Sequence, residues 1–244
     1  MKLIVIGSNS AGNSYALDAG GEILLLEAGC RMADVKRAID FRLKDVVGCC
    51  VSHVHGDHAK YATEYARFGV SVYGNADIAE NKHFPYGKCN VIKAGKTYRI
   101  GSFSVTPLDV AHDVPCLAFL VRHKSAGVLL FVTDTFKVPV TITGIDHYLI
   151  EANYADDILR KNVWDGKVDK AQADRIMLSH MSLNYTVKYL IESGGANAKT
   201  ITLCHLSERN SDPVMFRNVV QGALGIPCNI ATKGLTVELS KEII

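Results

Sequence analysis

Long hydrophobic runs are absent from this chain of 244 residues. No stretch approaches the roughly 20 apolar residues that span a bilayer. The N-terminal segment MKLIVIGSNSAG has too short an apolar part for a signal peptide and runs directly into a glycine-containing turn. We therefore expect this segment to form a first strand, in a soluble protein that does not contact a membrane.

The chain also lacks a C-x-x-C pair, and its seven cysteines are an odd number. Most of the cysteines lie in apolar contexts, which is typical of reduced, buried thiols. Because disulfides persist mainly in oxidising compartments, this pattern predicts a cytoplasmic protein. The cysteines are Cys30, Cys49, Cys50, Cys89, Cys116, Cys204 and Cys228.

Linkers rich in proline, glycine or serine, internal repeats and long basic tracts are missing as well. One domain over residues 1–244 is therefore the economical interpretation. The net charge of +2 neither requires nor excludes a polyanionic partner, because a local basic patch can lie on a nearly neutral protein. Basic residues at 122–124, 160–161 and 207–209 could line a groove, although scattered surface charge explains them equally. The sequence does not indicate an oligomeric state.

Short apolar runs bounded by Gly, Asp or Asn recur along the chain and indicate strands. We predict strands at 3–7, 14–20, 22–29, 46–53, 70–74, 97–112, 116–123, 127–135, 146–154, 199–207 and 229–239. Apolar residues at helical spacing predict helices at 31–43, 58–69, 184–195 and 212–225. This order favours an α+β fold of two mixed β-sheets packed together, with helices outside.

Histidine is sparse, with nine in the whole chain, yet three fall in the segment VSHVHGDHAKY at 51–61. At a strand end, residues two apart point the same way, so His53 and His55 can converge on one point. Asp57 and His58, where the chain turns into a helix, can reach a second point nearby. This spacing predicts two pairs of ligands for two metal ions. The alternative is a polar loop that is rich in histidine by coincidence.

Four residues cannot complete two coordination spheres, so further ligands must come from other segments. The candidates follow apolar runs, where a buried strand meets a loop. They are His112, Asp134, His180 and His205. For any one of them alone, a hydrogen-bonded structural role is the alternative. His83, His123 and His147 are expected to be solvated or locally hydrogen-bonded. Mixed imidazole and carboxylate ligands suit zinc, with manganese or iron as alternatives.

These motifs resemble the metallo-β-lactamase-fold superfamily in identity and order. The matching elements are SHVHGDH, His112, TDT with Asp134 and CHLS with His205, within residues 1–210. The resemblance implies a four-layer αββα sandwich with a site at one edge. It further implies the ligand sets. His53, His55 and His112 would hold one metal, Asp57, His58 and His205 would hold the second, and Asp134 would bridge them.

One position departs from the family pattern. The strand before the cluster usually ends in Asp, within DAG, whereas this chain has Glu27 within LLLEAG. The longer carboxylate can support the site in the same way only if the backbone shifts slightly.

A closer resemblance is to the YycJ/WalJ-like branch, whose members are regarded as DNA exonucleases. GSNSAGNSY at 7–15, SHM at 179–181 and CHLSERNSD at 204–212 carry it. The last histidines are also similar to those of the tRNA-processing ribonuclease Z enzymes. In those enzymes a histidine at the position of His180 assists phosphodiester cleavage and does not bind metal. Ser10, Asn13 and Ser14 could contact a substrate phosphate, or could simply form a polar turn.

The favoured hypothesis is a nuclease or other phosphodiesterase in which two divalent cations, zinc before manganese or iron, turn water into the nucleophile. Asp57 would orient that water or accept its proton, and His180 would protonate the leaving oxygen. Glu151 and Asn153 are candidates for support or substrate contact, or for strand-end capping. The alternatives are hydrolysis of a small thioester, lactone or β-lactam, or a metal-binding protein without catalysis.

Overall fold

The computed structural model describes residues 1–241, and its strands form two seven-stranded mixed sheets within that range. The first sheet has the order β14-β1-β2-β3-β4-β5-β6 and the second the order β13-β12-β11-β10-β9-β8-β7. The bounds in the first sheet are β1 Lys2–Gly7, β2 Ser14–Asp18, β3 Ile23–Leu26, β4 Val46–Cys50, β5 Val72–Gly74, β6 Cys89–Val91 and β14 Thr236–Glu238. The bounds in the second sheet are β7 Tyr98–Ile100, β8 Phe103–Val110, β9 Cys116–His123, β10 Gly127–Val132, β11 His147–Glu151, β12 Thr200–Cys204 and β13 Cys228–Ile230.

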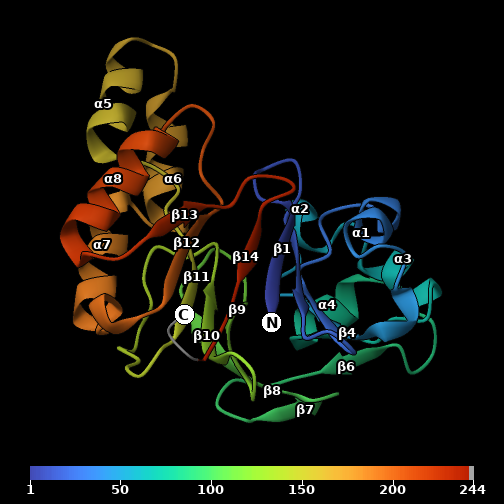
Figure 1. The fold of residues 1–244 in the computed structure, drawn as a ribbon. Helices are drawn as coiled ribbons and strands as arrows, with labels where there is room; N and C mark the ends of the chain where they lie inside the picture. Colours follow the sequence, from blue (N-terminus) through green and yellow to red (C-terminus); the bar gives the residue numbers. More distant parts are fainter. Residues whose placement is uncertain (242–244) are drawn as a thin grey trace.

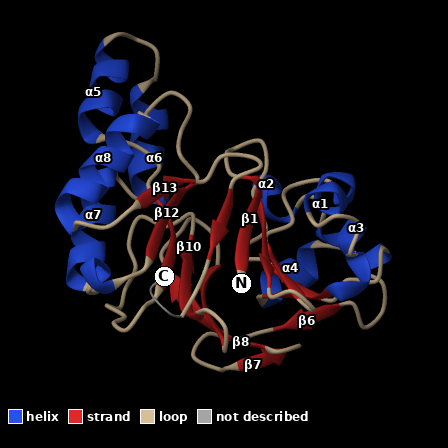
Figure 2. Ribbon diagram, viewed as in Figure 1, coloured by secondary structure: helices blue, strands red, loops and turns tan. Residues whose placement is uncertain are grey.

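Helices cover the outer face of each sheet. On the first sheet they are α1 Met32–Ala38, α2 Gly56–Ala59, α3 Ala62–Arg67 and α4 Ala76–Asn81, with a 3-10 turn η1 Leu43–Asp45. On the second they are α5 Asp156–Trp164, α6 Lys170–Ser179, α7 Leu183–Glu192 and α8 Pro213–Leu224, with η2 Gly195–Asn197. Figures 1 and 2 show the two groups of helices on opposite sides of the paired sheets.

Three apolar clusters separate these four layers. The middle cluster fills the space between the sheets, where Tyr15 and Phe131 meet edge to face with ring centroids 5.6 Å apart. A second cluster joins the first sheet to α1 and α3, and a third joins the second sheet to α7 and α8. The αββα sandwich expected from the sequence is therefore confirmed.

Several predicted elements differ from the observed ones. The helix predicted at 31–43 ends at Ala38, because Asp40 and Phe41 adopt left-handed backbone angles. The helix predicted at 58–69 is two helices, α2 and α3. The pair α5–α6, α4 and β6 were not predicted. His180 is consequently not at the end of a strand, as the sequence suggested, but caps the carboxyl end of α6.

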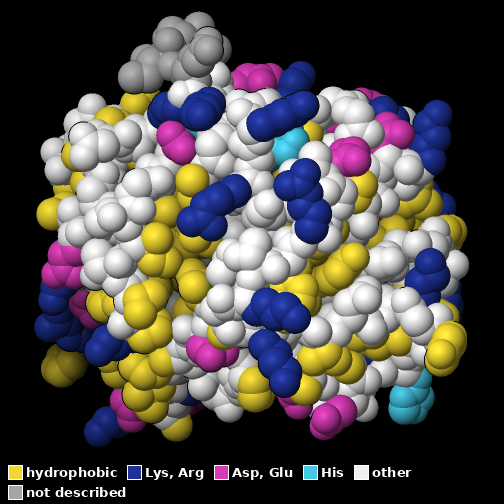
Figure 3. Space-filling model, turned by 90° about the horizontal axis from the view of Figure 1, so that it is seen from below, with side chains coloured by type: hydrophobic (Ala, Val, Ile, Leu, Met, Phe, Trp, Pro, Cys, Tyr) yellow, Lys and Arg dark blue, Asp and Glu magenta, His cyan; other side chains and the backbone are white. Residues whose placement is uncertain are grey.

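Positive charge is spread over the surface. Seen from below, Lys and Arg side chains are distributed across the face in Figure 3, among hydrophobic and uncharged ones. Within residues 1–241, no helix has the length and apolar character needed to cross a bilayer. All seven cysteines are free thiols.

Parallel pairing brings several strand ends to one edge of the sandwich. Strands β3 and β4 are parallel, as are β10, β11 and β12, so their carboxyl ends lie at a common edge within each sheet. Glu27, Asp134 and His205 follow β3, β10 and β12, and all three have positive φ angles, of 66°, 46° and 53°. Such angles cost about 1–3 kcal/mol each in a residue other than glycine. The fold thus holds strained residues where functional side chains are expected to converge.

Candidate metal centre

The first group of potential ligands consists of three imidazoles and one carboxylate. Atoms from His53, His55, His112 and Asp134 lie within 4.8 Å of one another. The Nδ1 of His112 donates to the carbonyl oxygen of Ser179 at 3.1 Å, which leaves the lone pair on Nε2. That Nε2 lies 3.9 Å from Asp134 Oδ2 and 3.3 Å from His55 Nδ1. Hydrogen bonding therefore presents His112 in the tautomer that a metal requires.

His53 shows the same arrangement in a fully buried position. Its Nδ1 lies 2.8 Å from the hydroxyl of Ser52. Its Nε2 has no hydrogen-bond partner in the described part of the chain and faces Asp134 Oδ2 at 3.7 Å. A buried polar atom without a partner is costly, and a cation between this nitrogen and the carboxylate would remove that cost.

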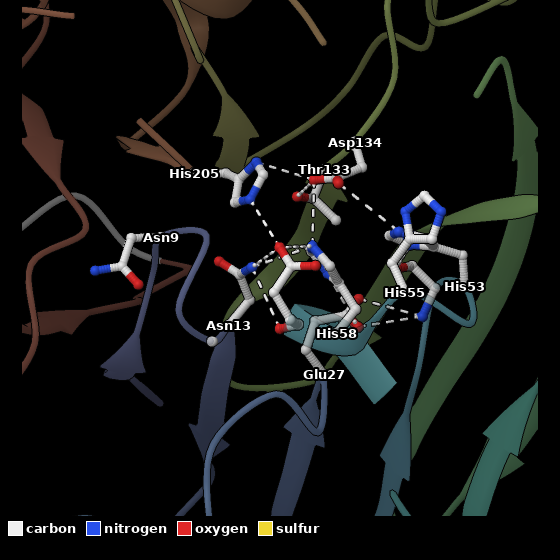
Figure 4. A network of polar contacts seen from close by, with 12 residues as sticks. Asn9, Asn13, Glu27, His53, His55, His58, Thr133, Asp134 and His205 are labelled. Atoms are coloured by element: carbon white, nitrogen blue, oxygen red, sulfur yellow. Dashed lines mark hydrogen bonds and ion pairs between the residues drawn. The ribbon is translucent and has the colours of Figure 1, made fainter. Parts of the chain in front are cut away.

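A second group shares Asp134 with the first. Asp57, His58, Asp134 and His205 also offer atoms within 4.8 Å of one another. Asp134 Oδ1 lies 3.3 Å from His58 Nε2 and 2.9 Å from His205 Nδ1, whereas its Oδ2 faces the first group. Asp57 Oδ2 lies 3.1 Å from His58 Nε2 and 3.2 Å from His205 Nε2. Figure 4 shows His58, Asp134 and His205 converging from separate elements. The two oxygens of Asp134 thus point toward different groups.

Electrostatics in the second group favour a positive charge. Burial alone would raise the pKa of Asp134, but His205 and His58 outweigh it and hold the pKa well below its usual range. Burial alone would lower the pKa values of His58 and His205, yet Asp134 raises both. Burial lowers the pKa of His53, and its neighbour His58 adds to this, which favours the neutral imidazole. A buried ionised carboxylate needs a positive partner, and a bound cation or an imidazolium meets that need.

Glu27 supports the second group from behind despite its extra methylene. Its carboxylate accepts from the backbone N–H of Ser52 at 3.2 Å and lies 3.4 Å from His58 Nδ1. Burial raises the pKa of Glu27, against the opposing effect of His58. Glu27 has a left-handed backbone, with a φ angle of 66°. Its contact orients the opposite nitrogen of His58 toward Asp134.

Glu151 contacts both His205, of the second group, and His180. Its Oε1 lies 2.7 Å from His180 Nδ1 and 3.0 Å from His205 Nδ1. Its Oε2 accepts backbone N–H groups of Thr135 and Met181, at 3.2 and 3.3 Å. Burial would lower the pKa of His180, but the Glu151 carboxylate outweighs it and raises that pKa. Glu151 therefore contacts a predicted metal ligand and the predicted acid at the same time. Atoms of Asp134, Glu151, His180 and His205 also lie within 4.8 Å of one another.

The three residues predicted to contact substrate occupy different environments. Ser10 is exposed and lines the cavity beside the ligands. Asn13 is fully buried, and its amide nitrogen lies 3.2 Å from Asp57 Oδ2 and 3.1 Å from His58 Nε2. Ser14 is also fully buried and donates to the carbonyl oxygen of Glu27 at 3.1 Å. In this structure Asn13 therefore contacts the second group, and only Ser10 faces open space.

A cavity of about 550 Å³ opens over the ligand groups. One wall is formed by α6, from which Arg175 enters the lining, and another by the segment after β12, which contributes Arg209. Arg209 belongs to the basic residues at 207–209 that the sequence offered as a possible groove lining, whereas Arg175 was not singled out, because α6 was not predicted. Asp113 was also missed, although its Oδ1 lies 3.0 Å from His112 Nε2. Its position directly after His112 was the only available signal.

The donor set fits divalent cations. Imidazole nitrogens and carboxylate oxygens are ligands that zinc, manganese and iron accept. The residues converge without cysteine, and the unpartnered Nε2 of His53 marks one place where a cation can bind. The structure thus contains His/Asp clusters that could hold divalent metal. Which residues serve as ligands stays a prediction.

Comparison with known proteins agrees with this architecture. No protein-family model matches the chain. It is 28% identical over 248 residues to the exodeoxyribonuclease WalJ of Streptococcus pneumoniae serotype 2, covering 92% of this chain and 90% of that protein. It is 25% identical over 236 residues to the exodeoxyribonuclease YycJ of Bacillus anthracis, covering 90% and 88%.

Among solved structures, the metallo-β-lactamase fold protein YhfI of Bacillus subtilis superimposes with a TM-score of 0.77. The alignment covers 97% of this chain and 99% of that one, at 20% sequence identity. At this identity the likeness establishes the fold alone. The chain is therefore a protein of the metallo-β-lactamase fold that resembles the WalJ/YycJ-like branch of that superfamily in sequence.

Proposed function

We propose that the protein is a metal-dependent phosphodiesterase that degrades DNA as an exonuclease. The observation that carries the proposal is the pairing of His180 with Glu151, at 2.7 Å, beside two ligand groups that share Asp134. Hydrolysis of a phosphodiester needs a nucleophile, charge stabilisation and a proton for the leaving oxygen, and this arrangement supplies groups for all three. The names of WalJ and YycJ support DNA as the substrate.

Two divalent cations, with zinc preferred and manganese or iron as alternatives, would bind the two groups. One cation would be held by His53, His55 and His112, and the other by Asp57, His58 and His205. Asp134 would contact both cations. When bound, such cations lower the pKa of water and stabilise the negative charge that develops on the phosphoryl group. The imidazoles are held in the required orientation by Ser52, Ser179 and Glu27 from outside each group.

Asp57 and His180, which line the same cavity, would complete the reaction. Asp57 lines the cavity and can orient the attacking water or accept its proton. His180 also lines the cavity, and Glu151 holds its Nδ1, so its Nε2 remains for the substrate. A proton on that nitrogen can pass to the leaving oxygen, or can neutralise charge on a non-bridging oxygen.

The walls of the cavity suit a nucleic acid. The side chains of Arg175 and Arg209 are exposed, and neither forms an ion pair with another residue in the range 1–241. Guanidinium groups bind phosphate in a bidentate manner, so both are available to flanking phosphates of a strand. The seven free cysteines support the prediction of a reducing, cytoplasmic compartment.

A substrate panel on the purified protein, with its metal content measured, tests the proposal. Elemental analysis should find divalent metal, and the protein should cleave bis-p-nitrophenyl phosphate and end-labelled DNA, with single nucleotides released from one end. RNA, a glutathione thioester and nitrocefin serve as competing substrates. Preferential cleavage of the thioester or nitrocefin, with DNA left intact, would instead assign the site to carbonyl hydrolysis.

A further inference from the structure

Beside the metal centre lies a second cavity, defined here as the flanking cavity. Six of its lining residues carry the argument: Gly12, Gly29, Arg31, Tyr61, Thr232 and Lys233. We propose that the flanking cavity binds a nucleotide adjacent to the scissile phosphate of a single strand. This inference rests on the proposed nuclease function.

The flanking cavity adjoins the catalytic one. Its volume is about 560 Å³, and it shares the wall residues Leu206, Ser207 and Glu208 with the cavity over the ligands. Sites for small ligands typically measure about 300–1,000 Å³, so the flanking cavity is large enough for a nucleotide. A strand with its scissile phosphate at the metal centre can cross this wall with the next nucleotide.

Glycine backbone forms a rigid floor. A Cβ added to Gly12 would lie 2.4 Å from the carbonyl oxygen of Gly29, and one added to Gly29 would lie 1.8 Å from that of Asp57. Asn13 connects the two regions, since its N–H donates to Asp57 at 2.7 Å and its carbonyl accepts from Gly29 at 2.9 Å. The floor is therefore fixed to the segment that carries the predicted ligands, and the cavity is pre-formed. Figure 4 places Asn9, which also lines this cavity, apart from the ligand cluster.

Two cations and one aromatic ring define the rim. Arg31 is exposed, and its Nε donates to the hydroxyl of Tyr61 at 3.4 Å. The Lys233 side chain is 74% exposed and lies 3.8 Å from Asp34. Asp34 also pairs with Arg37 at 3.2 Å, so its one negative charge is shared between two cations. The lining holds two cations, Arg31 and Lys233, and two carboxylates, Asp34 and Glu208. Arg31 forms no ion pair within residues 1–241, so its guanidinium is available for a phosphate.

These groups match the parts of a nucleotide. Lys233 and Arg31 can contact a backbone phosphate. The half-buried ring of Tyr61 lines the same cavity, with Lys60 Nζ 5.5 Å from its centroid, and is the aromatic group that a base can contact there. Glu208, in the wall that the two cavities share, is negatively charged and opposes the binding of a phosphate. Basic residues also lie on the face seen from below in Figure 3, so charge alone does not identify a path. The combination of exposed cations with a cavity that adjoins the catalytic one points to the flanking cavity as the path.

The test compares substrates of different length. The wild-type metal-loaded protein and the double variant Arg31→Ala/Lys233→Ala are assayed on bis-p-nitrophenyl phosphate and on a ten-nucleotide single strand. We expect the variant to raise KM for the ten-nucleotide strand about tenfold at low salt. The slope of log affinity against log salt should also flatten by about 0.7 for each phosphate that the variant no longer neutralises. Hydrolysis of the small diester should be unchanged, which also shows that the variant is folded.

Two further variants separate loss of charge from loss of space in the cavity and from a general effect of removing a surface lysine. Thr232→Trp fills the cavity without changing charge, and should raise KM for the strand while leaving the salt slope as in the wild type. Lys124→Ala is the matched control, because exposed Lys124 follows β9 at the end away from the site, about 25 Å along the strand from Cys116. It should have no effect.

Two results would overturn the inference in distinguishable ways. If the double variant and Thr232→Trp cleave the strand with wild-type KM, the flanking cavity binds no nucleotide, although the nuclease function stands. If the wild-type protein cleaves the small diester but no oligonucleotide, the nuclease function fails first and the subsite fails with it.

Discussion

Replacing Glu151 by glutamine tests how the centre is held together. In the wild type, Oε1 faces the Nδ1 atoms of His180 and His205, at 2.7 and 3.0 Å, while Oε2 accepts two backbone N–H groups. The amide of glutamine has one oxygen only. If this oxygen faces the backbone, its NH₂ group meets both imidazoles, which must then accept at Nδ1 and carry their protons on Nε2.

This change of tautomer weakens metal binding by the second ligand group. His205 Nε2 is the atom 3.2 Å from Asp57 Oδ2, and a proton there removes the lone pair that a metal needs. Loss of such a supporting contact typically costs about 10–100-fold in metal affinity or activity. At about 1.4 kcal/mol for each factor of ten, this corresponds to about 1.4–2.8 kcal/mol.

The assay measures kcat on bis-p-nitrophenyl phosphate and metal affinity by competition with a chromogenic chelator. Glu192→Gln serves as the control, because Glu192 is half-exposed at the end of α7 and distant from the ligands. We expect Glu151→Gln to lower kcat and affinity within that range and the control to leave both unchanged. Retention of kcat and affinity within twofold in Glu151→Gln would refute the reasoning.

Three further predictions concern other contacts. His180→Ala should slow phosphodiester cleavage about 100-fold or more at unchanged metal content, measured by kinetics and elemental analysis; loss of metal would contradict its assigned role. Asn13→Ala removes the amide donor 3.2 Å from Asp57 Oδ2 and should weaken metal binding about 10-fold in the chelator assay; wild-type affinity would refute this. Burial alone would raise the pKa of Asp18, but the contact with Arg42 outweighs burial and lowers this pKa. The pair should therefore stabilise the fold by about 1 kcal/mol above about pH 4. That contribution should be lost as the pH falls through the depressed pKa, so the difference in urea unfolding between Asp18→Asn and the wild type should be smaller at pH 2 than at pH 7; an equal difference at both would contradict it.

Most of the frame could be predicted from local patterns. Apolar runs ending in Asp134 and His205 marked strand ends, and parallel pairing then placed those ends at one edge. The spacing of His53 and His55 indicated a shared target because it depends only on strand geometry. In the structure Asp134 indeed lies between the two groups, with one oxygen toward each.

Other parts depended on packing that a local pattern does not contain. Helices α5 and α6 bury few apolar residues, and Leu159 and Ala173 are the only buried apolar side chains within the two helices. The sequence of α6 lacks a clear apolar stripe, whereas that of α5 carries one but was not recognised as a helix. Glu151 reaches His180 and His205 across 29 and 54 residues, and no spacing rule connects positions so far apart. The burial of Asn13 likewise follows from its pairing with a segment 44 residues away.

The conformation of Glu27 is a further feature that the sequence did not predict. A glutamate in place of aspartate suggested a shift of the backbone, but its direction could not be derived from the sequence. The structure shows a left-handed residue at this position, with the carboxylate reaching both Ser52 and His58. The same backbone geometry recurs at Asp134 and His205. Strain at three strand ends is therefore a property of the assembled site.

The central claim is that two ligand groups sharing Asp134 bind two divalent cations. Anomalous X-ray scattering from crystals of the zinc-loaded protein tests it most directly. Two peaks are predicted, one surrounded by His53, His55 and His112 and the other by Asp57, His58 and His205, with Asp134 contacting both. A single peak, or peaks that none of these side chains contacts, would contradict it.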